Sequence, residues 1–261
     1  MSRVSYRTEL GYRDGEKGTH TSRTMMLTEL SALLSICEPN ASKEEYFSAI
    51  IEDNALGKST GSTRKLSAQR LAELYALDTS VPIFRLLRRV WDFDPAGQAL
   101  SALLVALARD PLLRCTANSV LNLRAGESFN REAMAEALRK TTKQRLNEAT
   151  LDKVVRNAAS TWSQSGHLDG RTFKRRSMVQ PTAGPVSVAL FLGYLQGMRG
   201  PGILKSFWCQ ILDSSPETLA RIASTASMSG MIRFRIAGDV IEIGFPDLLT
   251  ANEMEVMHEP H

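Results

Sequence analysis

The clearest indication of the fold is the stretch SPETLARIASTASMSGMIRFRIAGDVIEIGF, residues 215–245. Its proline, Pro216, is typical of the first turn of a helix, and Gly230 is typical of a helix end. After Gly230, apolar and polar residues alternate as they do in a half-buried strand, and Gly238-Asp239 is typical of a hairpin turn. The stretch therefore predicts one helix followed by a β-hairpin.

Two further helices are predicted before this stretch. Residues 185–198 and 201–212 are apolar, and each segment begins with proline. Three helices followed by a β-hairpin is the order of elements in a winged helix, a variant of the helix-turn-helix. We therefore predict a winged-helix-like module over residues 184–249.

The same order of elements is predicted earlier in the chain, over residues 116–180. Amphipathic patterns predict helices over residues 130–140 and 150–166, the second with Thr150 as its N-cap. Residues 167–179 contain Asp-Gly at their centre, which indicates a hairpin. This segment is thus predicted to be a second helix-turn-helix or winged-helix-like module, and its hairpin is basic.

No segment before residue 116 alternates like a strand. Amphipathic patterns there predict helices over residues 23–36, 42–56, 62–77, 81–93 and 95–110. Short helices with short connections indicate an all-helical N-terminal domain over residues 23–115. Residues 1–22 are predicted to be a flexible or loosely docked arm, and residues 250–261 a disordered acidic tail. The fold class is mainly α: a helical N-terminal domain, then helix-turn-helix or winged-helix-like modules with short β-hairpin wings.

Residues 55–65, ALGKSTGSTRK, look like the end of a nucleotide-binding P-loop. A P-loop needs a glycine five residues before Gly57, but Glu52 stands there, and its carboxylate would repel phosphate. The segment also follows an amphipathic helix instead of a buried strand. We therefore predict a helix end at Gly57 and a new helix that is capped by Ser62 or Thr63.

Composition argues against a membrane protein. The 261 residues are 43% hydrophobic and 23% charged, as in a soluble globular protein. Their apolar runs are far shorter than the ~20 residues that a bilayer requires. The polar N-terminus is unlike a secretory signal, so we expect a cytoplasmic protein without membrane contact.

Catalytic and metal-binding patterns are not found in the sequence. The three cysteines lie far apart and the four histidines lack metal-ligand spacing, which argues against disulfides and a metal site. There is no nucleophile elbow, zinc-protease motif or dinucleotide fingerprint. We therefore expect no enzymatic activity, no cofactor and no small-molecule substrate.

Positive charge is concentrated in one block of the chain. Residues 139–176 carry ten Lys and Arg against three acids, a net charge of +7 on a chain whose total is +4. Such a block favours a polyanion-binding face, here formed by the polar side of helix 150–166 and by the hairpin after it. The predicted DNA contacts are Lys153, Arg156, Arg171, Lys174, Arg175 and Arg176 to phosphates, Asn157 and Ser160 nearest the bases, and Arg64 and Lys65 as secondary candidates.

The C-terminal module is predicted to present a less charged outward face. This face carries Thr218, Arg221, Thr225, Ser229, Arg233 and Arg235. Such residues suit weak DNA binding and protein docking equally well.

Three stretches, in this order and spacing, resemble the BrxA family: ALARDPLLR (106–114), TLDKVVRNAASTWSQSGHLDGRTFKRR (150–176) and IRFRIAGDVIEIGFPDLL (232–249). The most specific part is the pattern SxWxQSGHLxGRxxKxR, and the resemblance covers roughly residues 23–249. BrxA is a small core protein of BREX (bacteriophage exclusion) systems. The resemblance implies a mostly helical, non-catalytic protein with helix-turn-helix elements that binds double-stranded DNA. It also implies partners in phage defence, among them a DNA methyltransferase and ATPases.

Two alternative functions remain open from the sequence. The winged helices could dock partner subunits, which would make the protein an adaptor within the defence complex. A helical protein with a basic face could also bind RNA, as antitermination proteins do. Salt dependence of DNA binding separates the first alternative from the main prediction, and competition with structured RNA separates the second.

Overall fold

The computed structural model describes residues 8–238, 240–245 and 248–258. Helices make up most of this part of the chain, and its sheets are two antiparallel hairpins, so the predicted mainly-α fold class is confirmed. No single helix among the described residues is long and apolar enough to cross a membrane. The pair Pro95–Arg109 and Pro111–Leu121 reaches that length and composition only when taken together, and it is bent by 102°.

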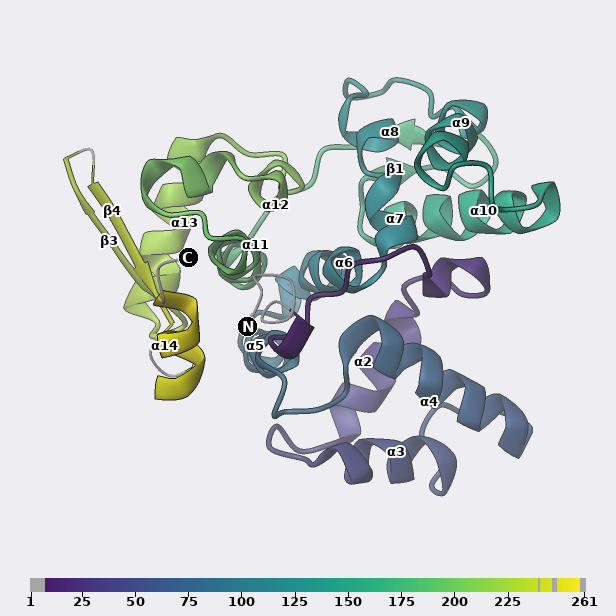
Figure 1. Ribbon diagram of the computed structural model, residues 1–261, viewed down its shortest axis with the longest axis horizontal. Helices are drawn as coiled ribbons and strands as arrows, with labels where there is room; N and C mark the ends of the chain where they lie inside the picture. Colours follow the sequence, from purple (N-terminus) through teal and green to yellow (C-terminus); the bar gives the residue numbers. More distant parts are fainter. Residues whose placement is uncertain (1–7, 239, 246–247, 259–261) are drawn as a thin grey trace.

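The first part of the chain is a stack of short helices. These are η1 (Thr19–Thr21), α2 (Leu27–Ile36), α3 (Lys43–Ile51), α4 (Gly61–Tyr75), α5 (Pro82–Phe93), η2 (Pro95–Gly97), α6 (Gln98–Arg109) and α7 (Pro111–Cys115). Figure 1 shows α2, α3 and α4 gathered at the lower edge of the molecule and α5 and α6 at its centre. Almost every residue of α6 is buried, which explains why its sequence is apolar on all sides.

Two helix boundaries in this part differ from the prediction. Helix α3 ends at Ile51, and the chain then turns before it reaches Gly57, which has a φ of +60°. Helix α4 is capped by Thr60 instead of Ser62 or Thr63, because the Thr60 hydroxyl accepts a hydrogen bond from the Thr63 N–H at 3.2 Å. The segment is therefore a turn and a helix cap, as the failure of the P-loop pattern suggested.

The next module contains the basic block. Its elements are α8 (Asn118–Leu121), α9 (Arg131–Thr141), α10 (Glu148–Gln164), β1 (Leu168–Asp169) and β2 (Arg175–Arg176). Ser128 forms an antiparallel bridge with Arg175, so a strand-like segment between α8 and α9 lies beside β2. Helix, bridged segment, two helices and hairpin is the order of a winged helix, with α10 in the place of the recognition helix.

Two details of this module correct the prediction. Helix α10 begins at Glu148 and is capped by Asn147, whose side-chain oxygen accepts from the Thr150 N–H at 2.8 Å, so Thr150 is not the cap. The hairpin pairs Asp169 with Arg175, which leaves a five-residue loop over 170–174 in place of a two-residue Asp-Gly turn. We call residues 170–174 the wing.

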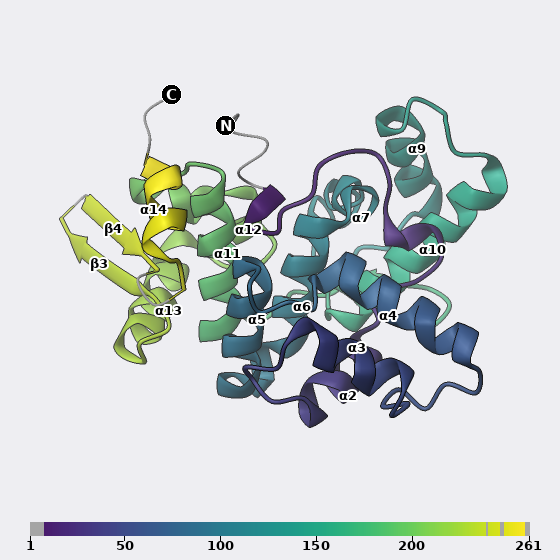
Figure 2. The ribbon, with the colours of Figure 1, turned by 60° about the horizontal axis from the view of Figure 1, so that its bottom comes forward.

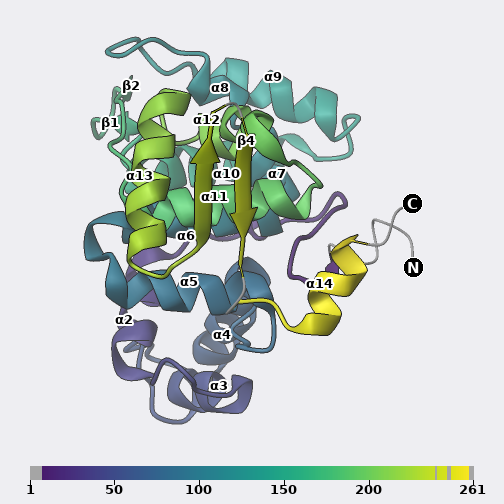
Figure 3. The same cartoon turned by 90° about the vertical axis from the view of Figure 1, so that its left-hand side faces the viewer.

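The C-terminal module repeats this plan and packs beside α6. Its elements are α11 (Ala183–Leu195), η3 (Gly200–Lys205), α12 (Phe207–Gln210), α13 (Pro216–Met228), β3 (Arg233–Ala237) and β4 (Val240–Gly244). The single helix predicted over 201–212 is divided, because Ser206 has extended backbone and caps α12 by accepting from the Cys209 N–H at 3.2 Å. Figure 3 shows the β3–β4 hairpin in front of α11, with α13 beside it.

The hairpin predicted from the opening stretch is present. Strands β3 and β4 are antiparallel, and Ala237 pairs with Val240. This register leaves a two-residue turn at Gly238, which has a φ of +58°, and position 239, which lies outside the described residues.

The described part of the N-terminal arm is docked on the molecule, so of the two predicted alternatives, flexible or loosely docked, the flexible one is wrong. Leu10 and Tyr12 are buried in the core, and the Tyr12 ring meets Trp208 edge to face at 6.1 Å. Figure 2 shows the segment passing over α7 to reach α10, where His20 is fully buried. Residues 1–7 lie outside the described part of the chain.

The acidic tail is also ordered, over α14 (Ala251–His258). Thr250 caps this helix by accepting from the Glu253 N–H at 3.2 Å, and the Glu253 carboxylate accepts from the Thr250 N–H at 2.7 Å. Arg85 of α5 holds the same carboxylate at 3.1 Å. This reciprocal cap and the ion pair explain why an acidic segment forms a helix here. Residues 259–261 lie outside the described part.

Candidate nucleic-acid interface

Four basic side chains from α9, α10 and the wing line a single groove of about 450 Å³. Its walls are Ser128, Phe129, Arg131, Arg156, Ala159, Ser160, Arg171, Thr172, Phe173 and Lys174. Four of these side chains are cationic and none is acidic. The structure thus brings together Arg156, Ser160, Arg171 and Lys174, which the sequence assigned to two separate elements. Lys153 does not line the groove, but it is exposed on α10 three residues before Arg156, so it lies beside the groove.

Weak ion pairs hold the cations at one rim of the groove. The Asp152 carboxylate accepts from Arg131 at 2.9 Å and lies 3.5 Å from Arg156. All three side chains are more than half exposed. Exposed pairs of this kind contribute about 0–1 kcal/mol, so a phosphate can replace the carboxylate at little cost.

The opposite wall is formed by the wing, which is fixed to α10. The Lys174 ammonium donates to the Ser163 hydroxyl at 2.7 Å and to the Gly170 carbonyl at 3.1 Å. Arg171 is exposed on the wing itself. Arg175 is exposed at the base of the wing, where its guanidinium donates to the Gly126 carbonyl at 3.1 Å. The wing therefore presents its charges from a defined position.

Elsewhere in the basic block, acids neutralise part of the charge. Arg139 pairs with Glu132 and Glu148 at 2.7 and 3.0 Å, and Arg145 pairs with Glu16. Within the described part of the chain, Lys153, Arg171, Lys174 and Arg175 form no salt bridge. The uncompensated charge of the block therefore lies on α10 and the wing and, at the end of α9, on the exposed Lys140 and Lys143, which likewise form no salt bridge among the described residues.

Arg176 is not a phosphate contact, which corrects the prediction. Its side chain is 1% exposed, and its guanidinium binds the Asp213 carboxylate at 2.5 Å. It also donates to the backbone carbonyl of Ser177. Asp213 additionally accepts from the Val179 N–H at 3.1 Å. Arg176 therefore joins the basic module to the C-terminal module inside the protein.

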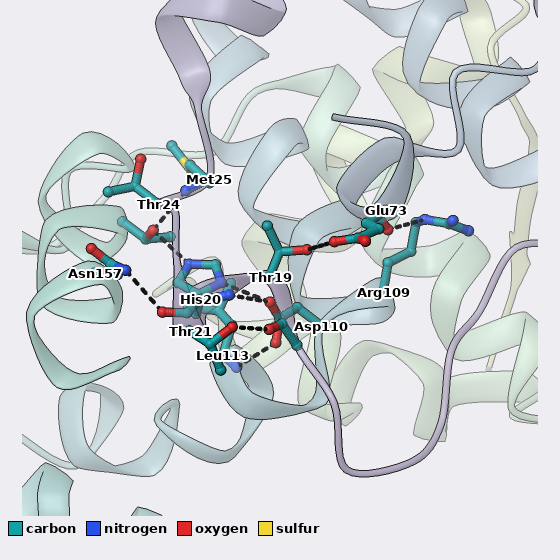
Figure 4. Close-up of polar contacts among 12 residues, drawn as sticks. Thr19, His20, Thr21, Thr24, Met25, Glu73, Arg109, Asp110, Leu113 and Asn157 are labelled. Atoms are coloured by element: carbon teal, nitrogen blue, oxygen red, sulfur yellow. Dashed lines mark hydrogen bonds and ion pairs between the residues drawn. The ribbon is translucent and has the colours of Figure 1, made fainter. Parts of the chain in front are cut away.

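Asn157 is also engaged inside the protein instead of facing bases. Its side-chain amide donates to the backbone carbonyl of His20 at 2.9 Å, a contact drawn in Figure 4. Ser160, its neighbour on α10, keeps its predicted place: it is half-buried in the groove wall, and its hydroxyl accepts from Gln164 at 3.3 Å. Only one of the two predicted base-facing side chains thus reaches the groove.

The secondary candidates on α4 lie outside the groove. The Arg64 guanidinium donates to the Ile51 carbonyl at 2.7 Å, so it satisfies the end of α3, and Arg64 is not among the residues that line the groove. Lys65 is exposed, but it is not among the residues that line the groove. These two residues are therefore removed from the interface.

His20, Asp110 and Thr161 form a chain of contacts that resembles a catalytic triad. The His20 ring lies 2.8 Å from the Asp110 carboxylate through Nδ1 and 2.8 Å from the Thr161 hydroxyl through Nε2. Figure 4 shows Asp110 also receiving the Leu113 N–H, at 3.0 Å. Burial disfavours the ionised carboxylate of Asp110. The His20 ring and the backbone N–H groups of Leu113 and His20 favour it more strongly, so the pKa of Asp110 is lowered.

This chain of contacts is structural, because all three side chains are buried beyond the reach of a substrate. The Thr161 hydroxyl also accepts from the Met25 N–H at 2.9 Å, which fixes the start of α2 against α10. The three residues therefore hold the N-terminal arm on the back of α10 and position that helix. Among the described residues, no three His, Cys, Asp or Glu side chains come together as a metal site would require.

His167 predicts a pH dependence of stability. Burial lowers the pKa of His167 to about 4, and its neutral ring donates to the Ile211 carbonyl at 2.8 Å. In the unfolded chain the His167 ring takes up a proton near pH 6.5, but in the folded chain it does so only near pH 4. The contribution of the neutral buried ring to stability is therefore complete above pH 6.5 and is lost as the pH falls toward 4. We expect a loss on the order of 3 kcal/mol between pH 7 and 4, measured by urea unfolding.

The control for this prediction is His167→Gln, which keeps an amide donor for the Ile211 carbonyl but cannot titrate. Its unfolding free energy should change less between pH 7 and 4.5 than that of the unmodified protein. Equal pH dependence in the two proteins would show that another group is responsible.

Some residues of the groove were missed by sequence reasoning. Arg131 follows the helix cap Asn130 and was regarded only as part of a helix. Phe173 stands between basic residues in the predicted hairpin, and an aromatic side chain there is a recognisable sign of a binding surface. Neither protein-family models nor curated proteins yielded a match to this chain.

Proposed function

We propose that this protein is a non-catalytic, double-stranded DNA-binding component of a BREX-type bacteriophage-exclusion system in the cytoplasm. The observation that carries the proposal is the groove between α10 and the wing, where four cationic side chains converge and no acid lines the wall. Phosphate binding dominates the affinity of proteins for duplex DNA, and a cationic groove supplies it.

In this proposal α10 enters the major groove and the wing follows the neighbouring backbone. A major groove about 12 Å wide admits one helix, and α10 has Lys153 and Arg156 exposed on its outward side. The wing would then place Arg171 and Lys174 against phosphates, with Arg175 at its base. Because few neutral polar side chains reach the groove, binding should depend more on the backbone than on base sequence.

The resemblance to BrxA supports the assignment to phage defence. Within its most specific pattern, Arg171 and Lys174 line the groove, whereas Trp162, His167 and Arg176 are buried. The pattern thus contains both residues of the proposed binding surface and buried residues that hold this surface in place. In such a system the DNA methyltransferase and the ATPases are the expected partners.

The adaptor function is kept as a second candidate because of the β3–β4 hairpin. Ile236 and Val240, near its turn, are 49% and 66% exposed. Apolar side chains at the end of a projecting hairpin suit contact with another protein. This surface lies on the C-terminal module, so docking there is compatible with DNA binding by α10 and the wing.

Equilibrium binding to a fluorescent DNA duplex tests the proposal. We expect binding at low salt that weakens steeply as salt is added, and a structured RNA of equal length should compete poorly. Stronger competition by the RNA would favour the RNA-binding function, and an absence of duplex binding would contradict the proposal.

A further inference from the structure

Phe173 is the most unusual side chain of the groove. It is 86% exposed at the wing, and it lines the same groove as the four cations. A single exposed apolar side chain is common on protein surfaces and requires no explanation by itself. An exposed aromatic ring beside converging cations is different, because this combination is how proteins hold unpaired nucleotides.

The backbone holds Phe173 in place. Gly170 has a φ of +100°, and a Cβ at this position would lie 2.3 Å from the Phe173 carbonyl oxygen. The loop can therefore close only with glycine here. Lys174, next in sequence, is fixed to the Ser163 hydroxyl of α10 at 2.7 Å. The ring is thus presented from a tight, anchored turn.

The groove behind the ring has the size and chemistry for one nucleotide. Its volume of about 450 Å³ lies within the ~300–1,000 Å³ that is usual for small-molecule sites. Arg156 and Arg171 can bind the flanking phosphates. The hydroxyls of Ser128 and Ser160, which also line the groove, can each donate to or accept from the edge of a base.

We propose that Phe173 stacks on an unpaired base and that the groove receives its nucleotide, so that the protein prefers duplex DNA containing an unpaired base. The inference rests on the proposed DNA binding and specifies which DNA is bound most tightly. Taking a base out of the stack has an energetic cost that is smallest where the base is already unpaired. Stacking on Phe173 therefore favours such sites over intact duplex.

The test compares two duplexes of the same length, one intact and one with a single bulged 2-aminopurine. We expect tighter binding of the bulged duplex and a change in 2-aminopurine fluorescence when the base stacks on the ring. Phe173→Ala should weaken binding of the bulged duplex by about tenfold and abolish the fluorescence change, while Phe173→Trp should retain both. Phe93→Ala is the matched control, since Phe93 is also exposed, at 54%, but lies on α5.

The outcomes separate this inference from the proposed function. If both duplexes bind equally and the 2-aminopurine signal is unchanged, the stacking proposal is wrong while duplex binding stands. If Phe93→Ala lowers the preference as much as Phe173→Ala, the ring of Phe173 is not its cause. If neither duplex binds, the proposed function fails and this inference fails with it.

Discussion

Replacing Arg176 with Ala is expected to lower the free energy of unfolding by about 3–5 kcal/mol, whereas replacing the adjacent Arg175 should leave it nearly unchanged. The two arginines follow each other in β2 but face opposite ways, Arg175 to solvent and Arg176 into the protein. Removing Arg176 leaves the Asp213 carboxylate, which is 5% exposed, without its cation. Urea unfolding of the two variants measures the difference directly.

A double variant separates the ion pair from packing. In Arg176→Met with Asp213→Asn, both charges are removed together, so the cost of a buried unpaired charge disappears and much of the lost stability should return. Asn suits the φ of +51° at this position and can still accept from the Val179 N–H. The affinity for DNA should respond in the opposite way. Arg175→Ala should bind DNA more weakly than wild type, whereas folded Arg176→Ala should bind it almost as tightly as wild type. Equal stability of the two single variants would contradict the assigned positions.

Neutralising the groove is expected to produce the largest loss of binding. The variant Lys153→Gln, Arg156→Gln, Arg171→Gln removes three exposed cations from α10 and the wing. Each phosphate contact contributes roughly 0.9 to the slope of log affinity against log salt. The loss of three contacts should therefore lower the affinity for DNA by two to three orders of magnitude at about 0.1 M salt. Because these side chains are exposed, stability should change little. Anisotropy of a labelled duplex measures the affinity.

The matched control carries the same three-charge change on the other module. Arg221, Arg233 and Arg235 lie exposed on α13 and β3, which repeat the order of α10 and its hairpin. Their replacement with Gln should reduce affinity much less, because only Arg233 of the three lines a groove, and the walls of that groove also carry the acid Glu242. Equal losses of affinity in the two variants would mean that the C-terminal module forms half or all of the DNA interface.

Periodicity and turn chemistry in the sequence were sufficient to predict most of the fold. The alternation after Gly230 and the short turn at Gly238 led directly to the β3–β4 hairpin. The 3.6-residue pattern of helix 150–166 correctly separated the core side of α10 from its basic side. These features depend on neighbours in sequence, which is why they can be read from one chain.

Contacts between distant segments could not be predicted in this way. Arg176 looked like one more basic residue of a hairpin, since its partner Asp213 lies 37 residues later. Asn157 looked exposed, because the arm that accepts its hydrogen bond is far away in sequence. Asn157 lies at the border between the buried and exposed faces of α10, where periodicity does not decide. Arg176 takes the inward position of a strand of only two residues, which is too short for an alternating pattern to be recognised in the sequence.

The tail was predicted wrongly for another reason. Its acidic composition suggested disorder, yet Thr250 and Glu253 have the spacing of a capping box, a signal that was present in the sequence. Arg85, the partner that stabilises the helix, lies on α5, 168 residues away in sequence. The helix cap, and not the acidic composition, therefore decides the structure of this segment.

The salt dependence of duplex binding tests the central claim most directly. Six cations in or beside the groove, namely Arg131, Lys153, Arg156, Arg171, Lys174 and Arg175, predict a slope of log affinity against log salt of about −5.4. The triple Gln variant should have a slope shallower by about 2.7. A wild-type slope near zero, or one that the three substitutions do not change, would contradict DNA binding by this groove.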